Sequence, residues 1–379
     1  MLTRRQFVKR AAVTVGAAWL AGPPTSAPAD QTTLKVAPFG EAIVIDGSAR
    51  ERGRKYGRLF ADGIQEFLDR EIDKAIIKDR WSKDDALRYA GACWKVIQSE
   101  CPIIADEMEG MAEGTGLRVE EHVLLTLHEE LYHRGNLPPI PHCTAVAVGK
   151  PQTKNGSTFV GQTWDWMPSV AGMSRMLHWR RDDGPSLLAY AFPGLWVGAG
   201  LNSNGLALCW TSAELGKPKQ TPRVGLPSYV FLAHLLYQKS LDTVREVAKR
   251  NRHAGWFTFV MGDATGRLMN VEGSPEGIEV VETTGRLVRI GFGSRKMSKT
   301  PTDADVKVHP RCTTMSGLLD QAGQQVELAT MQQAFADPAR GICVAKNTID
   351  MMIFDTTHRT AHLSRGFDYG VDWREFKFS

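Results

Sequence analysis

The stretch PHCTAVAVGKPQTKNGSTFVGQTWDWMP, Pro141–Pro168, predicts a β-hairpin whose first strand begins at a cysteine. The runs CTAVAVG and STFVGQTWD are rich in β-branched and aromatic residues, and the Asn155-Gly156 pair between them favours a turn. Antiparallel pairing of the two runs returns Asp165 to the strand end that carries Cys143. The sequence therefore predicts that a thiol and a carboxylate meet at one end of a sheet.

The chain before Cys143 is a Gly/Pro loop, RGNLPPIP, which ends any helix. A junction between an exposed loop and a rigid strand can be cut without unravelling the core. If the bond between His142 and Cys143 is broken, Cys143 carries both a thiol and a free α-amino group, whose ordinary pKa is about 7.7–8.0. This amine can take the thiol proton, and the thiolate can then attack an amide or thioester carbonyl.

Two interpretations of Asp165 stay open on the sequence alone. Its carboxylate can bind and orient the α-ammonium group that cleavage would create. It can equally be a surface aspartate between two packing tryptophans, Trp164 and Trp166, because single charged residues near strand ends are common.

The charge of the chain is concentrated at its N-terminus. The 379 residues carry a formal charge of +4, but residues 1–29 contain four basic and no acidic residues, which leaves 42 basic against 42 acidic residues in the remainder. A near-neutral remainder gives no indication of nucleic-acid binding or of attraction to anionic membranes. With 42% hydrophobic and 23% charged residues, the composition is that of an ordinary globular protein.

Residues 1–29 have the three parts of an export signal. The basic segment LTRRQFVKR is followed by the apolar run AAVTVGAAWLAG and by small residues that end at Ala29. The Arg4-Arg5 pair fits the twin-arginine pattern, which predicts the twin-arginine export machinery as a partner and a periplasmic or secreted destination. The apolar run is short for a membrane span, so no stable membrane anchor is expected. The alternative is a retained amphipathic N-terminal anchor.

The remaining motifs do not indicate a metal or organic cofactor. The six cysteines are scattered, with no CxxC pair and no cysteine–histidine cluster, and at least one more is unpaired if one is a working thiol. In HEELYH the histidines His128 and His133 are five residues apart, which is not the spacing of a zinc protease, so we expect surface or hydrogen-bonded helix residues. No phosphate-binding glycine loop follows a strand.

The two halves of the chain differ in their predicted structure. Residues 30–142 are mainly helical, and the first long helix begins near Ser48, with Glu51 placed to complete a capping box. From Cys143 to residue 379, short β-rich runs such as GLALCWT and WFTFVMGD alternate with turns, and helical stretches interrupt them. This order predicts α+β layers, with residues 30–379 folded as one unit.

The stretch CTAVAV…NGSTFVGQTWDW resembles the acyl-CoA:6-aminopenicillanic acid acyltransferase family of autoproteolytic N-terminal-nucleophile (Ntn) hydrolases. GSARERGRKYG, EMEGMAEGTGL, GLNSNGLAL, MGDATGRLMNVEG and MIFDTTHRTAHLSRG are similar to further segments of that family, in the same order. The resemblance implies a four-layer αββα fold. It also implies self-cleavage before Cys143, with Cys143 as the nucleophile, Asp165 orienting its amino group and Thr144 in the same opening motif.

The chain departs from the family pattern at several positions. His142 stands where the family usually has glycine before the nucleophile. Where the family often supports the oxyanion with asparagine, this chain has CWTSAEL, in which Thr211 or Ser212 can donate instead. Gln162 stands where bile-salt and penicillin V hydrolases have arginine, which favours the acyltransferase-like branch. Arg365 is a candidate for the arginine near the family's C-terminus.

Together these features predict an exported cysteine amidohydrolase or acyltransferase that acts on a linear amide of a small molecule or small peptide. Trp164, Trp166, Trp196 and Trp210 are candidates for an apolar acyl pocket, with core packing expected for at least two of them. After cleavage the two chains are expected to stay associated. Acyl-CoA is not expected outside the cytoplasm, which favours hydrolysis. The alternatives are an acyltransferase that passes the acyl group to an amine, and a non-catalytic exported binding protein.

Overall fold

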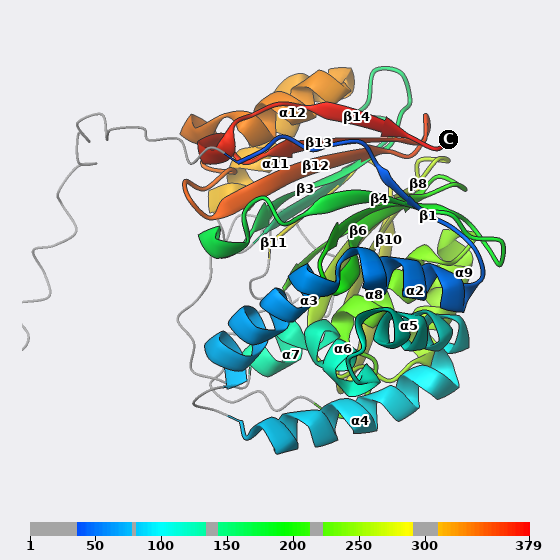
Figure 1. The fold of residues 1–379 in the computed structure, drawn as a ribbon. Coiled ribbons are helices and arrows are strands. Elements are labelled where there is room, and N and C mark those ends of the chain that lie inside the picture. Colours follow the sequence, from blue (N-terminus) through cyan, green and yellow to red (C-terminus); the bar gives the residue numbers. More distant parts are fainter. Residues whose placement is uncertain (1–35, 78–80, 134–142, 213–222, 291–309) are drawn as a thin grey trace, which may run out of the picture. The chain divides into compact units, whose positions relative to one another are not determined.

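Two β-sheets face each other in the computed structural model of the protein, and helices cover both outer faces (Figure 1). The structure describes residues 36–77, 81–133, 143–212, 223–290 and 310–379. Its layers follow the order helices, sheet, sheet, helices, so the predicted α+β, four-layer αββα architecture is confirmed. The predicted signal, residues 1–29, and His142 lie outside the described residues.

The larger sheet has eight strands in the order β1-β4-β5-β6-β7-β8-β9-β10. Their bounds are β1 Ile43–Ile45, β4 Arg175–Trp179, β5 Leu187–Phe192, β6 Leu195–Asn202, β7 Leu206–Ser212, β8 Phe257–Asp263, β9 Leu268–Ser274 and β10 Gly277–Thr283. Strands β4, β5 and β6 were not predicted from the sequence. Every residue of β5 and β6 is buried, so these strands form a continuous apolar run without the alternation that marks a half-exposed strand.

The smaller sheet has six strands in the order β11-β2-β3-β12-β13-β14. Their bounds are β11 Arg286–Ile290, β2 Thr144–Val148, β3 Phe159–Asp165, β12 Thr348–Asp355, β13 Thr360–Arg365 and β14 Arg374–Lys377. Strands β2 and β3 pair antiparallel, with Thr144 opposite Thr163 and Val148 opposite Phe159. The hairpin predicted from residues 143–166 is therefore confirmed.

Helices of the N-terminal half, together with two later ones, cover the larger sheet. They are α2 Ala49–Leu59, α3 Ala61–Phe67, the π-helix η1 Leu68–Ile77, α4 Lys83–Glu100, α5 Pro102–Thr115, α6 Val119–Thr126, α7 His128–His133, α8 Ser228–Leu236 and α9 Leu241–Arg250. The outer face of the smaller sheet packs against α11 Pro310–Ala322 and α12 Leu328–Ala336. Short 3-10 turns occur at Pro168–Val170, Gly323–Gln325, Pro338–Arg340 and Phe367–Tyr369.

The first helix begins as predicted but does not continue as one element. Ser48 and Glu51 form the capping box at the start of α2. The helix is interrupted at Phe60, whose φ of −111° and ψ of 13° lie outside the helical range, and the chain then forms α3 and the π-helix. Leu59, the last residue of α2, is 54% exposed.

Glycines bring α2 and α5 together until their backbones touch. Gly53 and Gly57 of α2 lie against α5, while Gly110 and Gly114 of α5 lie against α2. A Cβ atom added to Gly53 would lie 1.9 Å from the carbonyl oxygen of Glu107. No residue with a side chain fits at this contact without moving a helix.

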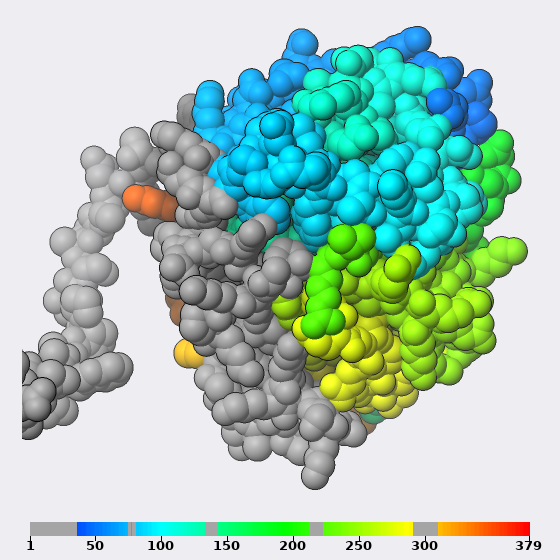
Figure 2. All heavy atoms as spheres, turned by 90° about the horizontal axis from the view of Figure 1, so that it is seen from below, coloured from blue at the N-terminus to red at the C-terminus, as the bar shows by residue number. Residues whose placement is uncertain are grey.

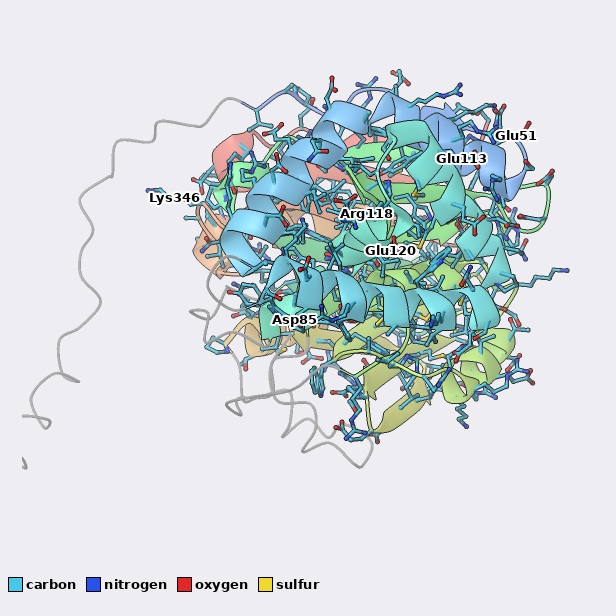
Figure 3. The ribbon with its side chains drawn as sticks, turned by 60° about the horizontal axis from the view of Figure 1, so that its bottom comes forward. Glu51, Asp85, Glu113, Arg118, Glu120 and Lys346 are labelled. Atoms are coloured by element: carbon cyan, nitrogen blue, oxygen red, sulfur yellow. The ribbon has the colours of Figure 1, made fainter. Side chains whose placement is uncertain are left out.

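Ion pairs flank this helix contact on the exposed side. Arg54 Nη2 of α2 donates to Glu113 Oε2 of α5 over 2.6 Å, and Arg50 Nε donates to the other oxygen over 2.7 Å. Figure 3 labels Glu113 on α5 beside the start of α2, where Glu51 lies. Exposed pairs of this kind contribute about 0–1 kcal/mol each. These surface charges therefore add little to the contact that the glycines make possible.

A buried ion pair connects the N-terminal helices to the rest of the chain. Arg52 Nη2 donates to Glu107 Oε1 over 2.8 Å, and both side chains are fully buried. Trp179 of β4 and Tyr237 after α8 donate to the same carboxylate over 2.9 Å and 2.6 Å. Burial of a charge is tolerated when it is paired and hydrogen-bonded in this way.

The N-terminal helices also lie beside later segments at the surface. Figure 2 shows the blue and cyan helices next to the lime and yellow part of the chain. Tyr89 Oη donates to the carbonyl oxygen of Arg223 over 2.9 Å, and Glu100 accepts from Asn251 Nδ2 over 2.8 Å. The part of the chain from Lys35 to Ser379 forms one compact unit. None of its described helices combines the length and apolarity needed to cross a membrane.

Candidate active site

The β2–β3 hairpin places Cys143 and Asp165 in direct contact. Cys143 immediately precedes β2, and Asp165 is the last residue of β3. The backbone N–H of Asp165 donates to Cys143 Sγ over 3.4 Å, and Sγ lies 3.8 Å from the carbonyl oxygen of Asp165. Residues 22 positions apart in the chain thus meet because the pairing of the two strands ends at this point.

Two donors hold the Asp165 carboxylate. Arg311 Nη1 of α11 lies 2.7 Å from Oδ2, and Thr348 Oγ1 of β12 donates to Oδ1 over 2.5 Å. Asp165 is only 7% exposed, and its burial raises its pKa to about 6, while the Arg311 guanidinium opposes this rise. The side chain is therefore a buried, paired carboxylate and not the surface aspartate of the alternative interpretation.

Arg311 and Thr348 were not identified from the sequence. Arg311 Nη1 also lies 3.5 Å from Thr144 Oγ1, so the guanidinium spans the first residue of β2 and the last residue of β3. Thr348 Oγ1 accepts from the backbone N–H of Val344 over 2.8 Å, which fixes the hydroxyl that faces Asp165. No local motif marks either residue, because both contacts depend on how distant elements dock.

The Cys143 thiol is strongly disfavoured from ionising by itself. Burial raises its pKa well above the ordinary range, and the nearby Asp165 charge raises it further. The Cys143 thiol in turn adds to the rise in the pKa of Cys209 on β7, which is mainly due to burial. A nucleophilic role for Cys143 consequently requires a base beside it. All six cysteines of the chain are free.

Side chains of β3 alternate between two environments. Asp165 faces α11 through its contact with Arg311. Gln162 lies on the opposite face of the strand, where its Oε1 accepts from the backbone N–H of Trp210 on β7, across the space between the sheets. Alternation along the chain puts Cys143 on the same face as Ala145 and Ala147, which belong to the core between the sheets. The thiol therefore belongs to the space between the sheets, and the carboxylate to the outer layer.

Three of the four predicted pocket tryptophans lie together. The Trp164 ring is 5.9 Å from that of Trp166 and 6.1 Å from that of Trp210, measured between centroids. Trp196 contacts a different residue: its Nε1 donates to Tyr237 Oη over 3.2 Å. All four are at least 96% buried, so they pack in the core, as predicted for at least two of them.

The other predicted residues are placed less directly. Thr211 is fully buried on β7, opposite Thr258, and the backbone of Ser212 pairs with Phe257; the Ser212 side chain lies outside the described residues. Arg365 binds Asp350 Oδ1 over 2.8 Å and Ser174 Oγ over 2.6 Å in a separate buried network. Among the described arginines, the one that contacts Asp165 is Arg311.

His128, the first histidine of HEELYH, differs from its prediction. His128 is 2% exposed, its ring lies 4.9 Å from that of Trp166, and neither ring nitrogen has a hydrogen-bond partner among the described residues. The expectation of a surface or hydrogen-bonded residue was therefore wrong for His128. In the part of the chain that the structure describes, no group of three or more potential ligands could hold a metal ion.

Comparisons with known proteins place this site in a family context. The family model described as acyl-coenzyme A:6-aminopenicillanic acid acyl-transferase matches residues 152–366, a range that includes Asp165, Arg311 and Thr348. A solved variant of conjugated bile acid hydrolase from Clostridium perfringens is 12% identical with a TM-score of 0.40, covering 62% of this chain and 97% of that chain. Penicillin V acylase from Agrobacterium tumefaciens is 13% identical with a TM-score of 0.39, covering 62% and 86%. Similarities to solved structures at this level do not bear on the chemistry of this chain.

Proposed function

The chain belongs to the acyl-coenzyme A:6-aminopenicillanic acid acyl-transferase family, and from this membership we propose that it is an autoproteolytic cysteine hydrolase that cleaves a linear amide. The observation that carries the proposal is the contact between Cys143, at the start of β2, and Asp165, whose buried carboxylate is held by Arg311 and Thr348. A thiol just before a strand, in contact with the backbone of a residue whose carboxylate is held in place, is suited to become a catalytic N-terminus.

Self-cleavage supplies the base that the thiol lacks. In the uncut chain the nitrogen of Cys143 is an amide and cannot accept a proton. Attack of Sγ on the His142 carbonyl forms the C–S bond, and the thiol proton passes to the departing nitrogen as the C–N bond breaks, so the acyl group moves from nitrogen to sulfur; water then hydrolyses the thioester. The products are a chain that ends at His142 and a chain that begins with the free amine of Cys143. With an ordinary pKa of about 7.7–8.0, that amine can accept the thiol proton near neutral pH.

Catalysis then uses the α-amine and the thiol of Cys143 together with the carboxylate of Asp165. The α-amine takes the Sγ proton while Sγ bonds to the substrate carbonyl carbon, and the α-ammonium returns the proton to the departing nitrogen as the C–N bond breaks. Water hydrolyses the resulting thioester and releases the acid and the thiol. Asp165, ionised above its pKa of about 6, holds the α-ammonium, and this cation lowers the pKa of Asp165 in return.

Contacts across the proposed cut support a lasting association of the two chains. Strand β1 pairs in parallel with β4, and the buried carboxylate of Glu107 accepts from Trp179 and Tyr237. These contacts join residues 36–133 to residues that follow Cys143. We further propose, from residues 1–29, that the protein is exported through the twin-arginine pathway and acts in the periplasm or outside the cell.

N-terminal sequencing of the purified mature protein tests the proposal. Two fragments, the second beginning Cys-Thr-Ala-Val, are expected, and Cys143→Ala should abolish both cleavage and amide hydrolysis. Cys101→Ala, a buried cysteine in the helical layer, is the matched control and should leave both intact. A wild-type chain that stays whole on prolonged incubation contradicts the autoproteolytic mechanism and favours the non-catalytic binding protein.

Acyl transfer to an amine is the second candidate, because the family description itself names an acyl-transferase. The same thioester would then react with an amine in place of water. Turnover of an acyl p-nitroanilide in the presence of added primary amines, with the products identified by mass spectrometry, separates the two outcomes. A new amide in place of the free acid supports transfer, and unchanged acid formation supports hydrolysis.

A further inference from the structure

Gln162 reaches across the space between the two sheets. It is fully buried, and its Oε1 accepts from the backbone N–H of Trp210 over 2.8 Å. This contact is possible because the ladder between β6 and β7 ends at Gly200 opposite Leu208, which leaves the N–H of Trp210 available to a side chain. Since only the amide oxygen can accept from an N–H group, the bond also fixes which terminal atom of Gln162 is the nitrogen.

The nitrogen of that amide lacks an acceptor. Gln162 Nε2 is buried and has no hydrogen-bond partner among the described residues. Burying an unpaired donor is unfavourable, so an orphaned donor inside a protein calls for an explanation such as a ligand. An amide NH2 can only donate, and the missing partner is therefore an acceptor, most simply an oxygen atom.

The strand register places this donor beside the nucleophile. Ala145 of β2 lies directly opposite Gln162 of β3, and Cys143 is two residues before Ala145 on the same face. Gln162 is thus the diagonal neighbour of Cys143, and such neighbours have Cβ atoms about 7–8 Å apart or somewhat less. The side chain of Ala145, which lies between them on this face, is a single methyl group.

We propose that Gln162 Nε2 donates to the carbonyl oxygen of the substrate that Cys143 attacks, which makes Gln162 a catalytic residue of the proposed reaction. As the bond from Sγ to the carbonyl carbon forms, the C=O electron pair moves to the oxygen, and the N–H of Gln162 stabilises the developing oxyanion. When the C–N bond breaks, the carbonyl re-forms and the same donor holds the thioester oxygen. Donors fixed before the reaction are effective because they need no reorganisation.

The inference rests on Cys143 being the nucleophile of the proposed function. Two reagents that react with this thiol isolate the stabilisation of the oxyanion by Gln162. Acylation of Cys143 by p-nitrophenyl acetate passes through a tetrahedral oxyanion, whereas alkylation by iodoacetamide does not. The two rates are measured by intact-protein mass spectrometry. Gln162→Met removes the donor, and Gln162→Glu keeps the oxygen that binds Trp210. Gln152→Met, in the turn at the far end of the hairpin, is the control.

Loss of the donor should slow acylation in Gln162→Met by about 10²- to 10³-fold while alkylation stays within a few-fold of wild type. In Gln162→Glu the ratio of acylation to alkylation should recover as the pH is lowered, because a protonated carboxyl group regains a donor. Gln152→Met should match wild type in both reactions. Parallel loss of both rates in the Gln162 variants, or no change in either, overturns the inference.

The two variants and the two reagents keep this test independent of the earlier proposal. If Gln162→Met fails to fold, Gln162→Glu carries the comparison, because it retains the contact with Trp210. A wild-type thiol that alkylates but does not acylate also overturns the role of Gln162. Failure of autoproteolysis is seen separately, as a single intact N-terminal sequence, and leaves the ratio of the two rates interpretable.

Discussion

Glu130 is predicted to make the protein less stable as the pH rises from 5 to 8. The carboxylate lies in α7, just before the segment that leads to Cys143, and is fully buried. Its Oε1 accepts from the backbone N–H and the hydroxyl of Ser228 over 2.8 Å and 2.6 Å, whereas its Oε2 is buried without a partner among the described residues. Burial raises the pKa of Glu130 to about 7, against the opposing effect of Ser228.

The direction and the size of this change in the free energy of unfolding follow from the linkage between protonation and folding. A carboxyl group whose pKa is raised in the folded state contributes stability below its unfolded pKa, and this contribution is lost as the pH rises through the folded value. The pKa rises from 4.5 to about 7. At about 1.4 kcal/mol per pKa unit, the loss between pH 5 and pH 8 approaches 3 kcal/mol.

Glu130→Gln isolates this effect because it keeps the oxygen that binds Ser228 and cannot ionise. We expect the unfolding free energy of the variant, relative to wild type, to increase by up to about 3 kcal/mol from pH 5 to pH 8. Urea unfolding of both proteins at pH 5, 6, 7 and 8 gives the comparison. Glu246→Gln, at an exposed position of α9, should show no such trend. A difference that stays constant with pH refutes the linkage reasoning.

Three further predictions concern the helix contact, the charge pair at the site and the association of the chains. Gly53→Ala should destabilise the protein by about 1–3 kcal/mol or more in urea unfolding, because its Cβ would meet the Glu107 backbone; Gly91→Ala, whose nearest atom is 3.7 Å away, should instead stabilise it by up to about 1 kcal/mol. Equal changes in the free energy of unfolding for Gly53→Ala and Gly91→Ala would contradict the packing argument. Arg311→Met should raise the pKa of Asp165 further above 6 and move the acid limb of the pH profile of kcat/KM to higher pH; an unmoved limb would exclude Asp165 as the titrating group. The two fragments should elute together in native size-exclusion chromatography and separate only in denaturant.

The sequence was informative where the relevant contact is local. The turn at Asn155-Gly156 and the β-rich runs on either side are enough to predict the hairpin, and the hairpin alone brings Asp165 to Cys143. The capping box of Ser48 and Glu51 is local in the same way. Strands β5 and β6 were missed because complete burial removes the alternation that a period-two pattern needs, and β4 shows no alternation either, because only its first residue, Arg175, is exposed.

The sequence was uninformative where a contact depends on docking. Arg311 and Asp165 are 146 residues apart in the chain. The sequence around Arg311 predicts a helix, but it does not predict where that helix packs. Thr348 is opposite Asp165 only because β12 pairs with β3. Arg365 is the one arginine that the sequence suggests for the family's C-terminal position, and the structure pairs its charge with Asp350. Propensity and periodicity do not distinguish two arginines that lie in different buried networks.

The position of Cys143 at the very start of a strand matters for the proposed mechanism. Successive side chains of a strand point to opposite faces, so the thiol faces the space between the sheets, as Ala145 does, while Asp165 and Arg311 meet on the outer side. A cysteine in mid-strand would have its nitrogen engaged in the ladder and would be separated from that carboxylate by the sheet itself. Cys143 stands one residue before β2, whose register with β3 begins at Thr144 opposite Thr163, and a free amine at this point can exchange a proton with Sγ and bind a carboxylate. A free amine at this point is therefore the simplest base that the fold can offer a thiol whose own pKa is raised by burial.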